Sequence, residues 1–350
     1  MTEEIQLTDT HKMILACMSL LPDIPVSAKE LFTYMNVDDA SMIYFFDSLE
    51  DLKDYGWIEG HSEGYIMKKD EALLVHQLIK PSVKNCYQFI NYFIKLFSDI
   101  NTESIDRIKK HELHVISILQ NLHEDSSTKA TLINVYANFL ALKGKYDEAN
   151  LLLGQAIEIQ KELNAAHPQL AIFYNDLSKL FLDQNNFEKS RQLARKSLDI
   201  ARLHHNNKEL AEVQINSYYL ITESFYKQKN YRLALTYLLR ALEIAYNKIP
   251  EKHDILTLLH HQIANIYRHL KDFNNSLLHI EKAMEHNSKN ANKQKRYTLP
   301  EGELKAQKEA FKQLIKHQKN LERLQKAGYA LLFILLATIV FLGIVHYFVK

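Results

Sequence analysis

Histidine is the residue type of this 350-residue chain best suited to bind a metal ion or to move protons, and the chain holds seventeen. The closest groups are HELH at 111–114, HH at 204–205 and HH at 260–261. The first lacks the four-residue spacing of the zinc-hydrolase motif HExxH. Adjacent side chains on a helix diverge by about 100°, so His260 and His261 are poorly placed to share one ion. We therefore expect packing or solvated histidines and no metal site.

The eight glycines decide whether the backbone can cradle a phosphate. They stand at positions 56, 60, 64, 144, 154, 302, 328 and 343, and none forms GxxxxGK[ST] or GxGxxG. Nucleotide hydrolysis is therefore not expected. No Ser-His-Asp or Cys-His arrangement is recognisable either. The sequence predicts no enzyme, no catalytic residue and no cofactor.

The composition describes a folded, mostly helical protein. A net charge of +1 with 24% charged residues argues against disorder throughout and against a generally basic nucleic-acid binder. Only 8 glycines and 6 prolines interrupt apolar residues that recur at three- and four-residue spacing, so we expect an all-α fold of two or three domains. Cys17 and Cys86 cannot build a disulfide framework, and we expect buried free thiols in a reducing compartment. The acidic N-terminus shows no secretory signal.

The last segment, 327–349, contains no Asp, Glu, Lys or Arg. About 20 apolar helical residues cross a bilayer core of roughly 30 Å, so we expect a single transmembrane helix here. Between Lys289 and Lys326, eleven basic residues stand against four acidic ones, which predicts a basic juxtamembrane helix at 291–326. We expect a tail-anchored protein whose bulk is cytoplasmic. The juxtamembrane helix could lie on anionic headgroups or pair with a second copy as a homo-oligomer.

Four segments in the middle of the chain share one pattern, repeated at intervals of 41, 44 and 42 residues. Each has an aromatic residue, a small residue three positions later and another small residue seven beyond that. The aromatic residues are Tyr146, Phe187, Tyr231 and Phe273, and the small residues are Ala149, Ser190, Ala234 and Ser276, then Ala156, Ser197, Ala241 and Ala283. Small residues let two antiparallel helices approach closely, and one pair alone cannot bury its apolar face. We therefore expect the helix pairs to stack.

This pattern resembles tetratricopeptide repeats, in particular the 42-residue repeats of kinesin light chains. The resemblance extends from about Lys129 to Asn290, and His167-Pro168 matches the family's His-Pro before a first helix. The family's early tryptophan is replaced by Ile133, Tyr174, Tyr218 and His260, and its glycine by Ala137, Ser178, Thr222 and Ala264. The resemblance implies an α-solenoid of four repeats over 128–290.

In this family the first helices of the repeats line a concave groove that binds a protein or peptide. The resemblance implies three rows of groove residues. The first row is Asn134, Asn175, Tyr219 and His261, the second is Asn138, Lys179, Glu223 and Asn265, and the third is Ala141, Leu182, Tyr226 and Arg268. Asparagine is a poor helix former that can donate to and accept from an extended backbone, which favours a binding role. The alternative is a solvated concave face that binds nothing.

Residues 1–82 show helical patterns and then a hairpin, which predicts a winged-helix-like domain. The helical patterns are His11–Leu21, Ser27–Met35, Asp38–Tyr55 and Asp70–Ile79, with two strand-like pieces around Gly60 to Gly64. Between Asp38 and Glu63 there are eight acidic residues and one basic residue. This stretch includes the helix and hairpin that would contact DNA in a winged-helix domain. Its acidic side chains repel phosphates, so we do not expect nucleic acid as a partner.

The same region resembles the winged-helix domain that follows the nucleotide-binding domain of NB-ARC signalling ATPases, and 83–127 resembles their helical linker. The ATPase domain is not in this chain, and Met67-Lys68-Lys69 stands where the family has a nucleotide-sensing Met-His-Asp motif. Together these features predict a membrane-tethered scaffold that binds a protein or peptide in its groove. One alternative is a membrane-sequestered transcriptional or signalling regulator acting through the winged-helix module. Another is a partner of a separate nucleotide-binding ATPase.

Overall fold

A computed structural model describes residues 7–98, 105–204, 207, 209–289 and 299–349. The chain forms two compact units, unit 1 (residues 1–204) and unit 2 (residues 205–350). The predicted domain boundaries at 82, 127 and 290 stay predictions.

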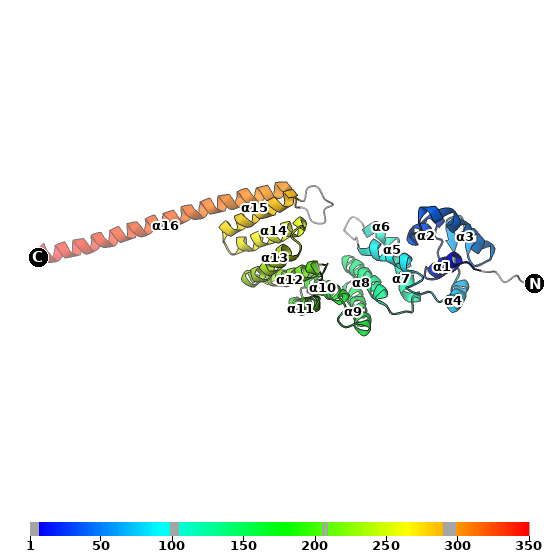
Figure 1. The fold of residues 1–350 in the computed structure, drawn as a ribbon. Coiled ribbons are helices and arrows are strands. Elements are labelled where there is room, and N and C mark those ends of the chain that lie inside the picture. Colours follow the sequence, from blue (N-terminus) through cyan, green and yellow to red (C-terminus); the bar gives the residue numbers. More distant parts are fainter. Residues whose placement is uncertain (1–6, 99–104, 205–206, 208, 290–298, 350) are drawn as a thin grey trace, which may run out of the picture. The chain divides into compact units, whose positions relative to one another are not determined.

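Unit 1 begins with helices followed by a hairpin (Figure 1). These elements are α1 (Asp9–Met18), α2 (Ala28–Tyr34), the short 3-10 helix η1 (Asp39–Ser41), α3 (Met42–Asp54), β1 (Glu59–His61), β2 (Gly64–Ile66) and α4 (Lys69–Leu78). Thr8 and Ser27 accept the N–H groups of the third residues of α1 and α2, which fixes where these helices start. The predicted helices and hairpin are therefore present, while the more specific winged-helix assignment stays a prediction.

Gly64 allows the hairpin to lie against the segment before α2. Strands β1 and β2 are antiparallel, and a bridge joins Tyr65 to Val26. Gly64 has a φ of +146°, and a Cβ added there would lie 2.3 Å from the Val26 carbonyl oxygen. Only glycine combines this backbone angle with so close an approach.

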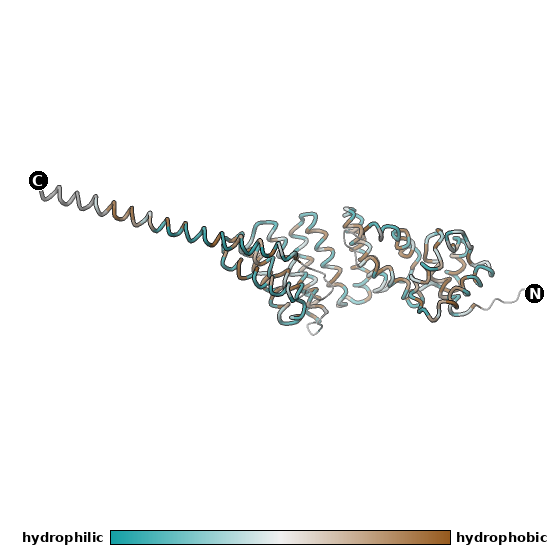
Figure 2. Tube along the Cα trace, turned by 90° about the horizontal axis from the view of Figure 1, so that it is seen from above, coloured by the Kyte–Doolittle hydropathy of each residue, from teal (hydrophilic) through white to brown (hydrophobic). Residues whose placement is uncertain are grey.

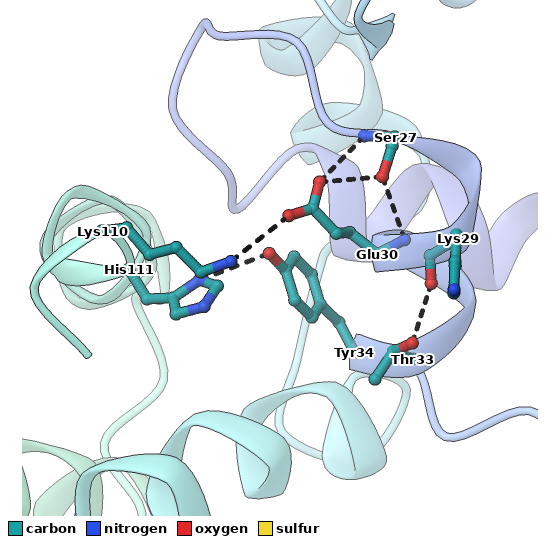
Figure 3. Close-up of polar contacts among 7 residues, drawn as sticks. All are labelled: Ser27, Lys29, Glu30, Thr33, Tyr34, Lys110 and His111. Atoms are coloured by element: carbon teal, nitrogen blue, oxygen red, sulfur yellow. Dashed lines mark hydrogen bonds and ion pairs between the residues drawn. The ribbon is translucent and has the colours of Figure 1, made fainter. Parts of the chain in front are cut away.

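Helices α5 (Tyr87–Ser98), α6 (Ile105–Lys109) and α7 (Glu112–Asn121) follow, and α5 and α7 contact α2 through the ring of Tyr34. Figure 3 shows two polar contacts at this junction: Lys110 Nζ lies 3.9 Å from Glu30 Oε1, and the Tyr34 hydroxyl lies 3.3 Å from His111 Nδ1. Burial raises the pKa of Tyr34, so its hydroxyl is neutral. One continuous apolar core extends from α1 to α11 of unit 1.

Four antiparallel helix pairs follow. Unit 1 contains α8 (Ser127–Leu142), α9 (Tyr146–Leu163), α10 (Gln169–Asp183) and α11 (Phe187–Leu203), and unit 2 contains α12 (Glu209–Lys227), α13 (Tyr231–Lys248), α14 (His253–His269) and α15 (Phe273–Lys289). The two helices of each pair lie side by side (Figure 1). All eight small residues predicted at the helix crossings are 0% exposed, which confirms the close approach of each pair.

The two helices of each pair are joined through one residue in the left-handed conformation. These residues are Gly144, Asn185, Lys229 and Lys271, with φ of 78°, 59°, 61° and 62°. The next amide N–H bonds back to a carbonyl five residues earlier, as from Asn186 to Phe181 at 2.8 Å, and so closes the first helix. The Asn186 side chain then accepts the N–H of Lys189 and starts the second helix. Two of the four turns place a lysine in this conformation, so the packing of the helices enforces it.

The last helix, α16 (Glu301–Val349), covers the end of the stack in unit 2. Leu304 and Phe311 are 0% and 3% exposed and pack against apolar side chains of α14 and α15. An array of stacked pairs needs such a cover, because its final pair otherwise leaves an apolar face in water. The predicted boundary at residue 326 falls inside this one continuous helix.

The predicted transmembrane helix at 327–349 requires a correction. No helix in the part of the chain that the structure describes is long and apolar enough to cross a membrane. Figure 2 shows hydrophilic residues at the start of α16 and a hydrophobic stretch further along. The side chains of residues 337 and 339–350 lie outside the described part.

The single-pass, tail-anchored localisation predicted from that segment is therefore wrong, and the predicted contact with a membrane through a single C-terminal span is not supported. The predicted pairing of the juxtamembrane helix with a second copy has no support among the described residues. Its residues from Glu301 onward are the N-terminal part of α16, where the buried positions face α14 and α15.

Candidate protein-binding surface

In unit 1, the first helices of the two repeats are joined by predicted groove residues. Asn134 and Asn138 of α8 both donate a side-chain N–H to Asp176 Oδ2 of α10, at 2.7 and 2.9 Å. Asn134 is 2% exposed. These asparagines therefore hold neighbouring repeats together, and Asn134 is not available to a peptide.

Asp176 is a functional position that the sequence analysis missed. Burial raises the pKa of this carboxyl group, while the bonds from Asn134 and Asn138 and the charge of Lys179 act in the opposite direction. Its only signal in the sequence is an acidic residue next to a predicted groove residue, Asn175, which is itself 7% exposed. Lys179 is exposed.

Unit 2 repeats this relation with different side chains. Gln262 Nε2 of α14 lies 3.4 Å from the Tyr219 hydroxyl of α12 and donates to it. In the repeat pattern Tyr219 stands where Asn134 stands in the first repeat, and Gln262 stands where Asp176 stands in the second. Asn134 and Tyr219, the first-row residues of the first and third repeats, therefore each contact the next repeat of their own unit.

A second contact joins α12 and α14 about two turns further along. The Tyr226 hydroxyl lies 2.8 Å from His269 Nε2, and the rings of His269 and Tyr231 stack at 4.5 Å. Burial raises the pKa of Glu223, which lies between the two contacts on α12, while a bond from the Tyr219 hydroxyl opposes this shift. The contacts fix the spacing of the two helices at this surface.

Side chains of opposite charge remain accessible beside these contacts. Glu223, Tyr226 and Asn265 are half-buried, and Arg268 is exposed. We call these four residues the α12–α14 surface. It presents a carboxylate, a phenol, an amide and a guanidinium group, which together can bind backbone and charged side chains of an extended chain.

His261, the fourth residue of the first row, lies under α16. It is 8% exposed, and burial lowers the pKa of its imidazole, while Glu303 and Gln307 of α16 act in the opposite direction. The start of α16 thus takes the place that a bound segment would need at this position. His261 contributes to the packing of the last helix.

Comparisons with known proteins agree with the repeat geometry. A tetratricopeptide repeat model matches residues 128–202, which cover α8 to α11. No curated protein is significantly similar in sequence. Among solved structures, aspartyl phosphate phosphatase F from Bacillus subtilis is similar with a TM-score of 0.54 and 16% identity, over 83% of this chain and 78% of that one.

Two other solved structures are less similar. BtubC (BKLC) from P. vanneervenii has a TM-score of 0.47 and 15% identity over 62% of this chain and 84% of that one. A signal transduction ATPase with a tetratricopeptide repeat sensor from Pyrococcus horikoshii has a TM-score of 0.42 and 18% identity over 82% of this chain. This chain covers 45% of that ATPase, less than half of its length. At such identities the likeness concerns the fold alone. The sequence match, the buried small residues and the shared turns confirm the predicted resemblance: residues 128–202 are tetratricopeptide repeats.

Proposed function

We propose that this protein is a scaffold without catalytic activity that binds an extended segment of a protein partner on the α12–α14 surface. One observation carries the proposal. Of the first-row residues, Asn134 and Tyr219 contact the next repeat and His261 lies under α16. By contrast, Glu223, Tyr226 and Asn265 are half-buried and Arg268 is exposed on two adjacent helices. A repeat scaffold suits protein–protein interaction because its stacked helices hold such a surface rigid.

The chemistry of the surface indicates what the partner segment carries. The Asn265 amide can both donate to and accept from a peptide backbone. Arg268 can bind a carboxylate through two parallel N–H bonds, and Glu223 offers a partly desolvated carboxylate to a cation. Tyr226 adds a flat apolar ring. We therefore expect an extended segment with one acidic and one basic side chain.

The test compares two triple variants of the full chain that change the same residue types. Glu223→Ala, Asn265→Ala and Arg268→Ala remove the surface, and Glu243→Ala, Asn247→Ala and Arg240→Ala remove exposed residues of α13. Linear peptides are first selected from a random display library on the wild-type chain. We expect the surface variant to bind them about 100-fold more weakly, because a few central side chains dominate binding energy, and the α13 variant to bind them normally. Equal binding by both variants would contradict the assignment.

We further propose that residues 1–82 form a module of the winged-helix type that contacts protein and not DNA. Its support is the order of helices and hairpin, together with the acidic composition of α3 and the hairpin. Of the acidic residues there, Glu50 pairs with Lys53, the one basic residue of the stretch from Asp38 to Glu63, and Glu59 pairs with Lys68 just after the hairpin. The remaining carboxylates repel phosphate groups.

We expect that this module does not bind duplex DNA. In an electrophoretic mobility assay with the full chain at about 50 mM salt, we expect no shift of a random duplex at micromolar protein, because binding requires cations that neutralise phosphates. A basic DNA-binding domain of known affinity serves as the positive control. A tight shift that weakens as salt is added would favour the regulator alternative.

A further inference from the structure

Four histidines and one tyrosine form a continuous chain of polar contacts inside unit 2. The contacts are His253 Nδ1 to His286 Nδ1 (3.1 Å), His286 Nε2 to the Tyr246 hydroxyl (3.2 Å), the Tyr246 hydroxyl to His260 Nε2 (2.7 Å), and His260 Nδ1 to His279 Nδ1 (2.9 Å). His260 is 0% exposed, and His279 and His286 are each 8% exposed. We call these five residues the histidine chain.

The spacing of the histidines on their helices produces this arrangement. His253 and His260 are seven residues apart on α14, and His279 and His286 are seven apart on α15. Seven residues are close to two helical turns, so both members of each pair face the same side. Because α14 and α15 are antiparallel, the first histidine of one helix meets the second of the other. Tyr246 reaches in from α13, so the histidine chain crosses from the third repeat to the fourth.

The neutral histidine chain can satisfy every contact. A neutral imidazole has one N–H donor and one lone pair, and a hydroxyl can donate once while it accepts. All four contacts can therefore point in one direction, from His253 to His279 or the reverse. No proton has to be added or removed.

Protonation breaks this arrangement. An imidazolium has two N–H groups and no lone pair. When both His260 and His279 are charged, two N–H groups face each other across 2.9 Å, and the same holds for His253 and His286 across 3.1 Å. Acid therefore converts two attractive contacts between α14 and α15 into repulsive ones.

The surroundings also disfavour the charged forms. Burial lowers the pKa of His260 to about 3, with His279, His286 and Lys282 acting in the same direction. Burial and Lys282 lower the pKa of His279 to about 4.

The remaining neighbours come from all three helices. Burial lowers the pKa of His286, His253 of α14 and Lys289 and Lys282 of α15 add to this shift, and Glu285 opposes it. Tyr246 is the titratable group that α13 contributes, and the ring of Tyr267 of α14 lies 5.6 Å from His279. Among the residues that the structure describes, no group of three His, Cys, Asp or Glu could hold a metal ion. The proton is therefore the ligand to which this cluster is suited.

We propose that the histidine chain is an acid-sensitive switch that holds α14 and α15 of the fourth repeat together at neutral pH and lets them separate in mild acid. The inference does not depend on the proposed binding surface, because it concerns the packing of unit 2. If both hold, partner binding also weakens in acid, since Asn265 and Arg268 lie on α14.

The direction and size of the effect follow from linkage. The folded-state pKa values of His260 and His279 lie below the ordinary value of 6.5, so the unfolded state binds more protons in acid. The stabilisation is fully present above about pH 6.5 and is lost as pH falls toward about 4. Compared with neutral pH, each of the two histidines raises the equilibrium constant for opening at pH 5.5 by about tenfold. The two together raise it by about 100-fold.

Hydrogen exchange measured by mass spectrometry on the full chain tests this inference. Exchange is measured at pH 7.5 and 5.5 and corrected for intrinsic rates, with α8 to α11 of unit 1 as the internal reference. We expect opening of α14 and α15 to increase by at least about 100-fold relative to that reference. The proposal is overturned if the wild-type helices of both units respond equally to pH.

Two variants locate the effect. His260→Gln with His279→Gln is expected to reduce the pH response to about tenfold or less, the remainder coming from His286 and His261, whose pKa values burial also lowers. His317→Gln on the exposed part of α16 is the matched control and should keep the full response. A full response in the double variant would also overturn the proposal. If the double variant fails to fold, the wild-type comparison alone decides.

Discussion

Replacing Phe173 by alanine is expected to lower the free energy of unfolding of unit 1 by about 3–5 kcal/mol. Phe173 lies on α10, is 0% exposed, and belongs to the apolar core that extends from α1 to α11. Removing the ring deletes its contacts and leaves a cavity that stacked helices cannot fully close. Since neighbouring repeats share this core, the loss affects the cooperative unit and not α10 alone.

The chain supplies a selective probe and a control for this experiment. Trp57 is the only tryptophan, and it packs against the same core, so its fluorescence during urea unfolding reports unit 1. Ile172→Ala changes the preceding residue, which is 39% exposed, and should cost less than about 1 kcal/mol. Equal losses for the two variants would show that α10 does not present Phe173 to the core.

Replacing Asp176 by alanine is expected to cost about 2–4 kcal/mol at pH 7. The carboxylate accepts one hydrogen bond each from Asn134 and Asn138. In the alanine variant both side-chain N–H groups lose their acceptor, and each buried donor without a partner costs about 1–3 kcal/mol. Asp176→Asn keeps one carbonyl oxygen that can accept both bonds, so it should cost less than about 1 kcal/mol. Urea titrations of the full chain, followed through Trp57, measure both values.

The pH dependence separates the roles of charge and shape at Asp176. Its pKa in the folded state is raised above the ordinary value of 3.8, so the extra stability that protonation of this group contributes is fully present below that value and is lost as pH rises through the folded-state pKa. The two bonds from Asn134 and Asn138 remain at pH 7. Asp176→Asn does not titrate and escapes this loss. The stability of the Asn variant relative to wild type should therefore rise with pH. An opposite trend would mean that the folded state favours the charged carboxylate.

Features that depend on one repeat at a time were predictable. The aromatic and small residues recur within segments of sixteen residues, and a helix places residues three, four and seven apart on one face. Ala149 and Ala156 illustrate this: both were predicted to lie at a helix crossing, and both are fully buried. The left-handed turn at Lys229 was not visible, because no glycine marks it and only the packing of α12 on α13 requires it.

Features of the candidate site that join two repeats were only partly predictable. Asn134 and Glu223 both lie on the side of a repeat's first helix that was predicted to line the groove. Asn134 is bonded to the next repeat, whereas Glu223 stays half-buried. The difference depends on the side chain that the neighbouring repeat presents about 42 residues later. The membrane helix was expected from composition alone, and no helix in the described part of the chain is long and apolar enough to cross a membrane.

The helix pairs, their crossings and the tetratricopeptide pattern were visible in the sequence, because periodicity along one helix encodes which face is buried. The sequence could not show that His261 lies under α16 or that His260 meets His279, since the register between helices depends on packing across many residues of the chain. The same seven-residue spacing of histidines on two parallel helices would leave the pairs in a different register. Antiparallel packing of α14 on α15 makes them a connected chain.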